Sequence, residues 1–172
     1  MSIKIHSFQC GPMNNMSYII ADEVSKLAVI IDPTWEVDRL IQFITDHTLQ
    51  PEAIWLTHTH YDHIQGLSQC ETAFNAIPVF VHKEEIDVID VSNPREIHDG
   101  QLLSLGQSSW QVYHTPGHSP GGCCFYFSPH LIAGDTIFID GCGRADMPGS
   151  DANALYDSLV RIKQLPRDTI IY

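Results

Sequence analysis

The sequence has few basic residues. It contains 9 Lys and Arg against 21 Asp and Glu, which makes its formal net charge −12. Proteins that bind nucleic acids usually carry a basic patch on one face, and no stretch of this chain clusters Lys or Arg. The composition therefore argues against a nucleic-acid partner. An acidic protein can still bind an anionic substrate where a metal and one or two basic side chains focus the local field.

Long apolar runs and paired cysteine motifs are also missing. No run approaches the roughly 20 apolar residues that a membrane span needs, and the first residues, MSIKIHSFQC, do not resemble a signal peptide. We therefore expect a cytoplasmic protein without a membrane partner. The five cysteines are odd in number and include no Cys-x-x-Cys pair, which argues against a disulfide framework or a cysteine-rich zinc site.

The 172 residues suit one domain, and 44% hydrophobic residues are enough to build a core. Apolar periodicity predicts helices at residues 35–48, 66–75 and 151–165. Short apolar or alternating runs predict strands at 2–8, 16–21, 27–32, 53–56, 77–82, 101–106, 109–115, 121–127, 131–135 and 168–172. This order predicts two packed sheets with helices outside them, a layered α/β domain.

The stretch LTHTHYDHIQG places three histidines and an aspartate in six residues. If the backbone is extended, His58 and His60 point the same way and can share one ion. Asp62 and His63 follow where the chain must turn toward a helix, and could face a second ion. Imidazole and carboxylate at this density suit Zn²⁺, Fe or Mn²⁺ better than Ca²⁺ or Mg²⁺, which prefer oxygen ligands.

Two later stretches offer further ligands. HTPGHSPGG places His118 after a turn that follows a predicted strand, and LIAGDTIF places Asp135 directly after an apolar strand and a glycine. Either residue alone is a weak signal, because a turn histidine or a capping aspartate is common. Together with the histidine cluster they complete a metal shell on rigid supports.

The motifs THTHYDH, TPGHS and AGDTIF, in this order and at these separations, resemble those of the metallo-β-lactamase superfamily. The resemblance covers essentially the whole chain and implies a single domain, 1–172, with a four-layer αββα sandwich and metals at one edge. It also implies a ligand set: His58, His60 and His118 for the first metal, Asp62 and His63 for the second, and Asp135 between both.

The stretch FIDGCGRADMPGSDANALYDSL, with LPRDTIIY after it, resembles the glyoxalase II-like branch, the hydroxyacylglutathione hydrolases. In that branch the basic residue of the Gly-Cys-Gly-Arg/Lys loop contacts the glutathione part of the substrate, a role that falls to Arg144. Two features depart from the branch. Asp146 stands where an aromatic residue is expected, and the helical domain that follows the sandwich has no counterpart in these residues.

The resemblance implies hydrolysis of a small-molecule thioester by a metal-bound hydroxide, with a glutathione thioester as one candidate. Two Zn²⁺ are the expected metals, and Fe or Mn are alternatives. Asp62 and Asp135 are then the catalytic residues. A second hypothesis is a mononuclear Fe(II) persulfide dioxygenase that uses His58, His118 and Asp135. A third is a metal-binding domain without turnover.

In the superfamily a last histidine follows the final strand and completes the second metal shell. Here no histidine follows Asp135, and the predicted last strand reaches Tyr172. We therefore expect the natural protein to continue past this point, and the second metal to bind weakly to these 172 residues. We expect surface or packing roles for the histidines outside the motifs; for His114 an indirect role near the metal is an alternative.

Overall fold

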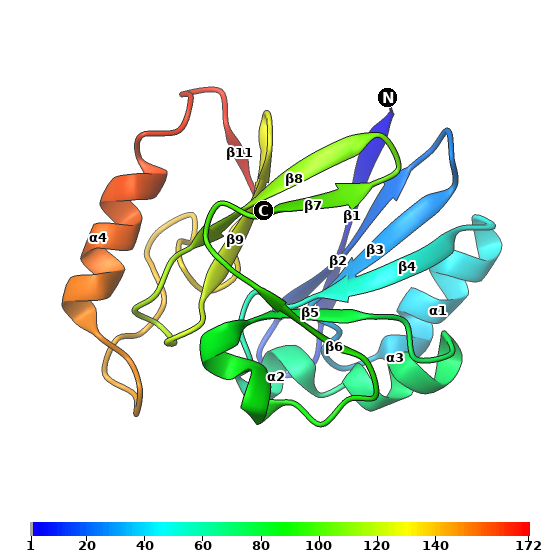
Figure 1. Cartoon of the computed structure of the whole chain (residues 1–172), viewed down its shortest axis with the longest axis horizontal. Helices are drawn as coiled ribbons and strands as arrows, with labels where there is room; N and C mark the ends of the chain where they lie inside the picture. The colour runs from blue at the N-terminus through cyan, green and yellow to red at the C-terminus, as the bar shows by residue number, and fades with distance from the viewer. Residues whose placement is uncertain (1) are drawn as a thin grey trace.

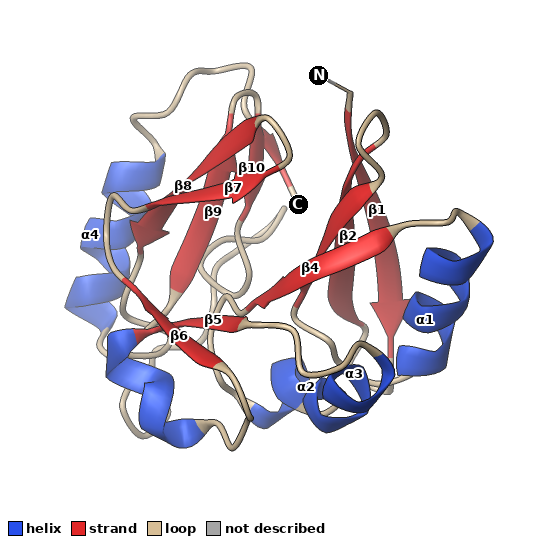
Figure 2. Cartoon of the chain, turned by 45° about the vertical axis from the view of Figure 1, so that its right-hand side comes forward, coloured by secondary structure: helices blue, strands red, loops and turns tan. Residues whose placement is uncertain are grey.

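The computed structural model describes residues 2–172. Two sheets pack face to face, and helices cover their outer faces (Figure 1). Turning the molecule by 45° shows the same layers from another side (Figure 2). The predicted αββα sandwich is therefore confirmed.

The first sheet joins an antiparallel half to a parallel half. Its strands, in spatial order, are β1 (Ile3–Cys10), β2 (Asn15–Asp22), β3 (Leu27–Ile31), β4 (Gln50–Trp55), β5 (Val79–His82) and β6 (Pro94–Ile97). The first three form hairpins, whereas β3 to β6 run parallel. Parallel strands need crossover connections, and these contain α1 (Val37–Asp46), α2 (Tyr61–Ile64), α3 (Leu67–Ala73) and the 3-10 helix η1 (Lys83–Val88).

The second sheet is antiparallel except at one edge. Its strands are β7 (Leu102–Leu105), β8 (Ser108–His114), β9 (Cys123–Phe127), β10 (His130–Ile132) and β11 (Ile170–Ile171), and β11 runs parallel to β10. The helix α4 (Ala152–Ile162) covers its outer face (Figure 1). The side chain of Asp151 accepts hydrogen bonds from the backbone N–H groups of Asn153 and Ala154 and so caps the N-terminus of this helix.

Strand alternation divides the apolar residues between three layers. Ile20 and Trp55 point into the core between the sheets, while their chain neighbours Ile19 and Ile54 face α1 and α3. In the second sheet Phe125 faces inward and Cys124 faces the side of α4. The two sheets pack on each other through this central core, and this packing determines how the loops at their shared edge meet.

The sequence analysis missed β6. Only Ile97 of its four residues is buried, because β6 is the edge strand of its sheet and shows no alternation of apolar residues. Within residues 2–172, no helix combines the length and the apolar character that crossing a membrane requires.

Candidate metal centre

The predicted metal ligands lie together at one edge of the sandwich. They come from loops of both sheets: the segment between β4 and α2, the helix α2 itself, the loop between β8 and β9, and the turn after β10. The residues are His58, His60, Asp62, His63, His118 and Asp135.

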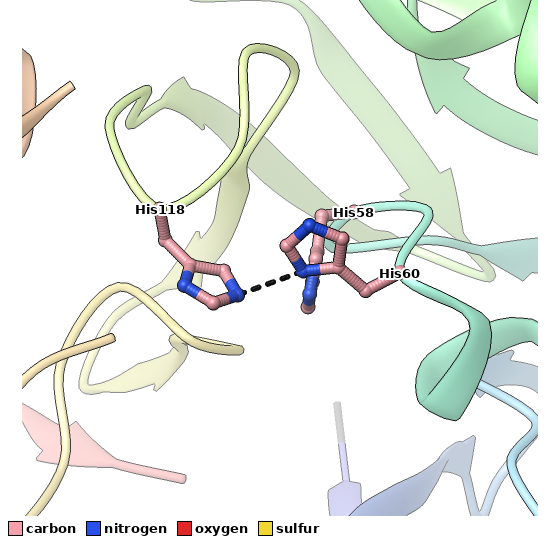
Figure 3. Close-up of side chains that lie close together, drawn as sticks. All are labelled: His58, His60 and His118. Atoms are coloured by element: carbon pink, nitrogen blue, oxygen red, sulfur yellow. Dashed lines mark hydrogen bonds between the residues drawn. The ribbon is translucent and has the colours of Figure 1, made fainter. Parts of the chain in front are cut away.

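His58, His60 and His118 form what we call the three-histidine cluster. Each offers one ring nitrogen, and these nitrogens all lie within 4.8 Å of one another. Nδ1 of His60 is 2.9 Å from Nε2 of His118 (Figure 3). Figure 3 also shows that His58 and His60 come from one loop and that His118 approaches from the opposite loop. This convergence from two sheets is the arrangement that a shared ion requires.

Hydrogen bonds determine which nitrogen of two histidines faces the cluster. Nδ1 of His118 donates to the carbonyl oxygen of Arg144 at 2.9 Å. The Thr57 hydroxyl donates its only proton to Asp32, so it accepts from Nδ1 of His58, 3.1 Å away. In the neutral rings both Nε2 atoms therefore keep a lone pair, which is the form that binds a metal.

The Nε2 atom of His58 is the feature of the site that best fits a metal ion. It is buried and has no hydrogen-bond partner among the described residues, although leaving a buried polar atom unpaired costs free energy. Burial and then the nearby His63 lower the pKa of His58 well below its usual value. The ring is therefore neutral at pH 7, and a metal ion fits this nitrogen in both position and protonation state.

Asp62, His63 and Asp135 form what we call the aspartate cluster. Nε2 of His63 lies 3.3 Å from Oδ1 of Asp135 and 4.0 Å from Oδ2 of Asp62. The other oxygen of Asp135 lies 3.4 Å from Nε2 of His118. Asp135 thus contacts a histidine of each cluster, and its role as a ligand between two metals stays a prediction.

The charges of the aspartate cluster differ from those of the histidines beside it. Burial disfavours a charged His63, but the carboxylates of Asp135 and Asp32 raise the pKa of this ring to about 10. His63 therefore carries a proton at pH 7 in the metal-free protein, and a metal at this ring has to displace that proton. The expected weak binding of a second metal stays a prediction.

Asp32 is a residue of the site that the sequence analysis did not identify. It follows β3 and is buried. It accepts hydrogen bonds from the backbone N–H of Thr57, from the Thr57 hydroxyl and from Nδ1 of His63. Its oxygens are occupied by these donors, so Asp32 orients His63 directly and His58 through Thr57. A buried aspartate at the end of an apolar strand, in the stretch IIDPT, was the available signal.

Residues 10–172 match the family model described as Metallo-beta-lactamase superfamily. The chain belongs to the metallo-β-lactamase superfamily. One relative is the probable polyketide biosynthesis zinc-dependent hydrolase PksB of Bacillus subtilis (strain 168). It is 38% identical over 151 residues, which cover 87% of this chain and 67% of the relative.

A second relative of the superfamily is the hydroxyacylglutathione hydrolase of Klebsiella pneumoniae subsp. pneumoniae. It is 34% identical over 169 residues, which cover 98% of this chain and 63% of the relative. This chain thus spans about two thirds of the length of both relatives. The crystal structure of TTHA1623 in a di-iron-bound form superposes with a TM-score of 0.84 and 30% identity, covering 97% of this chain and 90% of that one. These relatives place the chain among the metal-dependent hydrolases of the superfamily, with zinc in one name and iron in another.

The Gly-Cys-Gly-Arg loop of this superfamily member packs directly on the metal centre. A Cβ atom on Gly143 would lie 2.0 Å from the carbonyl oxygen of Asp135 and 2.8 Å from the ring of His118. Only glycine permits this approach. The guanidinium of Arg144 is exposed and pairs with Asp146 through contacts of 2.9 Å and 3.1 Å. Its backbone carbonyl therefore serves His118, while contact of its side chain with substrate stays a prediction.

A pocket of about 1070 Å³ opens beside the aspartate cluster. Asp62, His63 and Asp135 lie on its wall, and the rest of the lining is mostly apolar, with Met13 and Phe138 among its exposed side chains. The pocket can therefore receive an apolar group whose reactive end reaches the metal ligands.

Two histidines outside the motifs stack on each other between the sheets. The rings of His82 and His114 are 3.8 Å apart and nearly parallel. Nε2 of His114 donates to the carbonyl oxygen of Pro120, in the loop that carries His118. These contacts place both rings in packing and hydrogen-bonding positions, and an indirect role of His114 near the metal stays a prediction.

Proposed function

We propose that this protein is a metal-dependent hydrolase that cleaves a thioester. The observation that carries the proposal is the buried, unpartnered Nε2 of His58, which faces the ring nitrogens of His60 and His118. A structural role explains neither the unpaired nitrogen nor three imidazoles that converge from two sheets. A metal ion explains both.

The chain's own donors divide into two sets for metal ions. His58, His60 and His118 would hold the first, Asp62 and His63 the second, and Asp135 would lie between them. Such metals supply a water of lowered pKa and polarise the carbonyl under attack.

The carboxylates of the site would orient and deprotonate the attacking water. Asn15 donates to Oδ2 of Asp62 at 2.8 Å and holds this carboxylate at the wall of the pocket. Burial alone would raise the pKa of Asp135, but the hydrogen bond with His63 opposes this effect, and the pKa of Asp135 is lowered overall. Asp135 is therefore ionised at neutral pH, as is required of a group that accepts a proton. No serine or cysteine nucleophile is needed for this reaction.

Two observations support a thioester as the substrate class. The chain is similar to a hydroxyacylglutathione hydrolase, and the mostly apolar pocket suits an acyl group. These observations do not identify the thiol that carries the acyl group. Arg144 is the basic residue that would contact glutathione, and its side chain is paired with Asp146. We therefore propose the thioester first and glutathione as one candidate carrier, bound through Arg144.

Metal analysis and two assays on the full chain test the proposal. Protein purified without added metal is analysed for Zn, Fe and Mn, then loaded with Zn²⁺ and given S-lactoylglutathione or a simple acyl thioester. Release of free thiol, lost on His58→Ala, is the expected result. A single bound iron with O₂ consumption on glutathione persulfide would instead favour the dioxygenase. Metal binding without either reaction would leave a metal-binding domain.

A further inference from the structure

Glu85 joins the two loops that carry the three-histidine cluster. It lies in η1, only 4% of it is exposed, and it is not one of the predicted ligands. Its Oε2 accepts the backbone N–H of Thr59 at 2.7 Å, and its Oε1 accepts the backbone N–H of Gly121 at 2.8 Å. Thr59 stands between His58 and His60, and Gly121 follows His118 by three residues.

The contacts of Glu85 connect segments that belong to different sheets. Thr59 extends from β4 of the first sheet, and Gly121 precedes β9 of the second. Two other hydrogen bonds join these segments beside the metal centre. The backbone N–H of Cys123 donates to the carbonyl oxygen of Thr57 at 2.7 Å, next to His58, and the bond between His60 and His118 joins two ligands that a metal would separate. The Glu85 carboxylate acts together with the Cys123 bond, closer to the ligands His60 and His118, and uses no ligand nitrogen.

The surroundings of Glu85 are built for this carboxylate. A Cβ atom on Gly121 would lie 2.8 Å from Cγ of Glu85, so glycine is needed for the close approach. Among the ion pairs of residues 2–172, none includes Glu85. Burying a carboxylate without a cation costs free energy, and here the two N–H groups compensate. By contrast, the adjacent Glu84 is exposed and lies 3.9 Å from Lys83.

We propose that Glu85 is a positioning residue that fixes the separation of the His58–His60 loop from the His118 loop, and so determines the affinity of the three-histidine cluster for its metal. The proposal rests on the metal centre proposed above. Metal ligands must be held within about 0.5 Å of their productive geometry. A support that holds both loops at once meets that demand better than two independent loops.

The test compares substitutions of Glu85 with two matched controls. Glu85→Gln keeps the size, but its NH₂ group faces one of the two N–H donors, so one contact is lost. Glu85→Asp keeps the charge but is too short to reach both loops. Glu84→Gln removes a charge from the same 3-10 helix without touching either loop. Asp22→Asn alters another buried carboxylate that accepts a backbone N–H, in a hairpin turn of the first sheet.

Zn²⁺ affinity of the full chain is measured against a competing chelator, and amide hydrogen exchange is measured on the metal-free protein. Both Glu85 variants should lose about 10–100-fold in Zn²⁺ affinity, the loss typical of groups that orient metal ligands. Exchange should rise at Thr59 and Gly121 in particular. Glu84→Gln and Asp22→Asn should bind Zn²⁺ like the wild type, even if Asp22→Asn lowers the melting temperature as much as Glu85→Gln does.

Wild-type affinity in Glu85→Gln and Glu85→Asp would overturn the proposal, as would an equal loss in Asp22→Asn. If neither variant folds, Gly121→Ala breaks the same contact by displacing Glu85, and the same loss of affinity is expected. A wild-type chain that binds no Zn²⁺, Fe or Mn would be a different failure. It would refute the proposed function and, with it, the role of Glu85 in metal binding.

Discussion

The three-histidine cluster and the aspartate cluster lie side by side but are prepared differently for a metal. His58 is buried and neutral, with its free nitrogen already facing its partners. The side chains of Asp62 and Asp135 keep 14% and 26% of their surface exposed at the pocket, and His63 between them holds a proton. One cluster is thus a formed site for a cation, whereas the other must lose a proton first. We expect the first metal to bind at the histidines.

The largest effect is expected where the two clusters meet. His58 is a member of the three-histidine cluster, and it also offers a ring nitrogen within 4.8 Å of donor atoms of Asp32 and of His63, a member of the aspartate cluster. His58→Ala should remove metal from both clusters, with a loss of affinity beyond the about 10–100-fold seen for outer partners. Elemental analysis and the thioester assay measure this loss. The exposed His98→Ala is the control, and two metals retained by His58→Ala would contradict the prediction.

A smaller and unequal effect is expected at Asp32. Its carboxylate contacts His63 directly but reaches His58 only through Thr57. Asp32→Asn should therefore weaken the aspartate cluster by about 10–100-fold and the three-histidine cluster by less. Loss of hydrogen bonds to a buried charged group should also lower the free energy of unfolding by about 1–3 kcal/mol. Stepwise Zn²⁺ titration measures the affinity of each cluster separately. Equal losses of affinity at both clusters would contradict the prediction that Asp32 acts mainly on the aspartate cluster.

A third effect is expected at the exposed ion pair of Arg144 and Asp146. Arg144→Ala should raise the KM for S-lactoylglutathione about fivefold, because an exposed charged contact contributes up to about 1 kcal/mol. Asp146→Ala should lower this KM, because it releases the guanidinium from its ion pair. Metal content should stay unchanged in both variants, since only the backbone carbonyl of Arg144 contacts His118. Changes of KM in the same direction would show that the ion pair does not compete with substrate.

The smallest effect on metal binding should lie outside both clusters, at His82, where the change concerns stability. Burial and the neighbouring His114 lower the pKa of His82 to about 4 from 6.5. Between these values the unfolded chain binds the proton more readily, so the free energy of unfolding falls as the pH drops from 6.5 to 4. The slope is at most about 1.4 kcal/mol per pH unit. His82→Phe, which keeps the stack on His114, should flatten this dependence in urea unfolding at pH 4 to 7. If the free energy of unfolding of His82→Phe depended on pH as in the wild type, this pH dependence would not be due to His82.

Most of the fold could be predicted from periodicity, because strands buried on one or both faces alternate or run apolar. The exception, β6, is an edge strand that buries only Ile97. The six predicted ligands of the candidate site lie together in the structure. They could be predicted because histidine and aspartate at strand ends are recognisable as donors. Asp32 and Glu85 escaped prediction. A carboxylate that accepts backbone N–H groups from distant loops has the same local sequence as one exposed to water, as Glu84 beside Glu85 illustrates.

By itself the sequence determined which donors are present and that four of them share one turn, since spacing along a chain is a local property. It also determined the alternation that separates the core layers. Only the tertiary structure decided that His118 meets His60 across 58 residues, and that Asp32 and Glu85 accept hydrogen bonds from His63 and from the loops that carry the other ligands. These contacts depend on how two sheets pack through their shared core, and packing over such distances follows from the whole fold, not from any one motif.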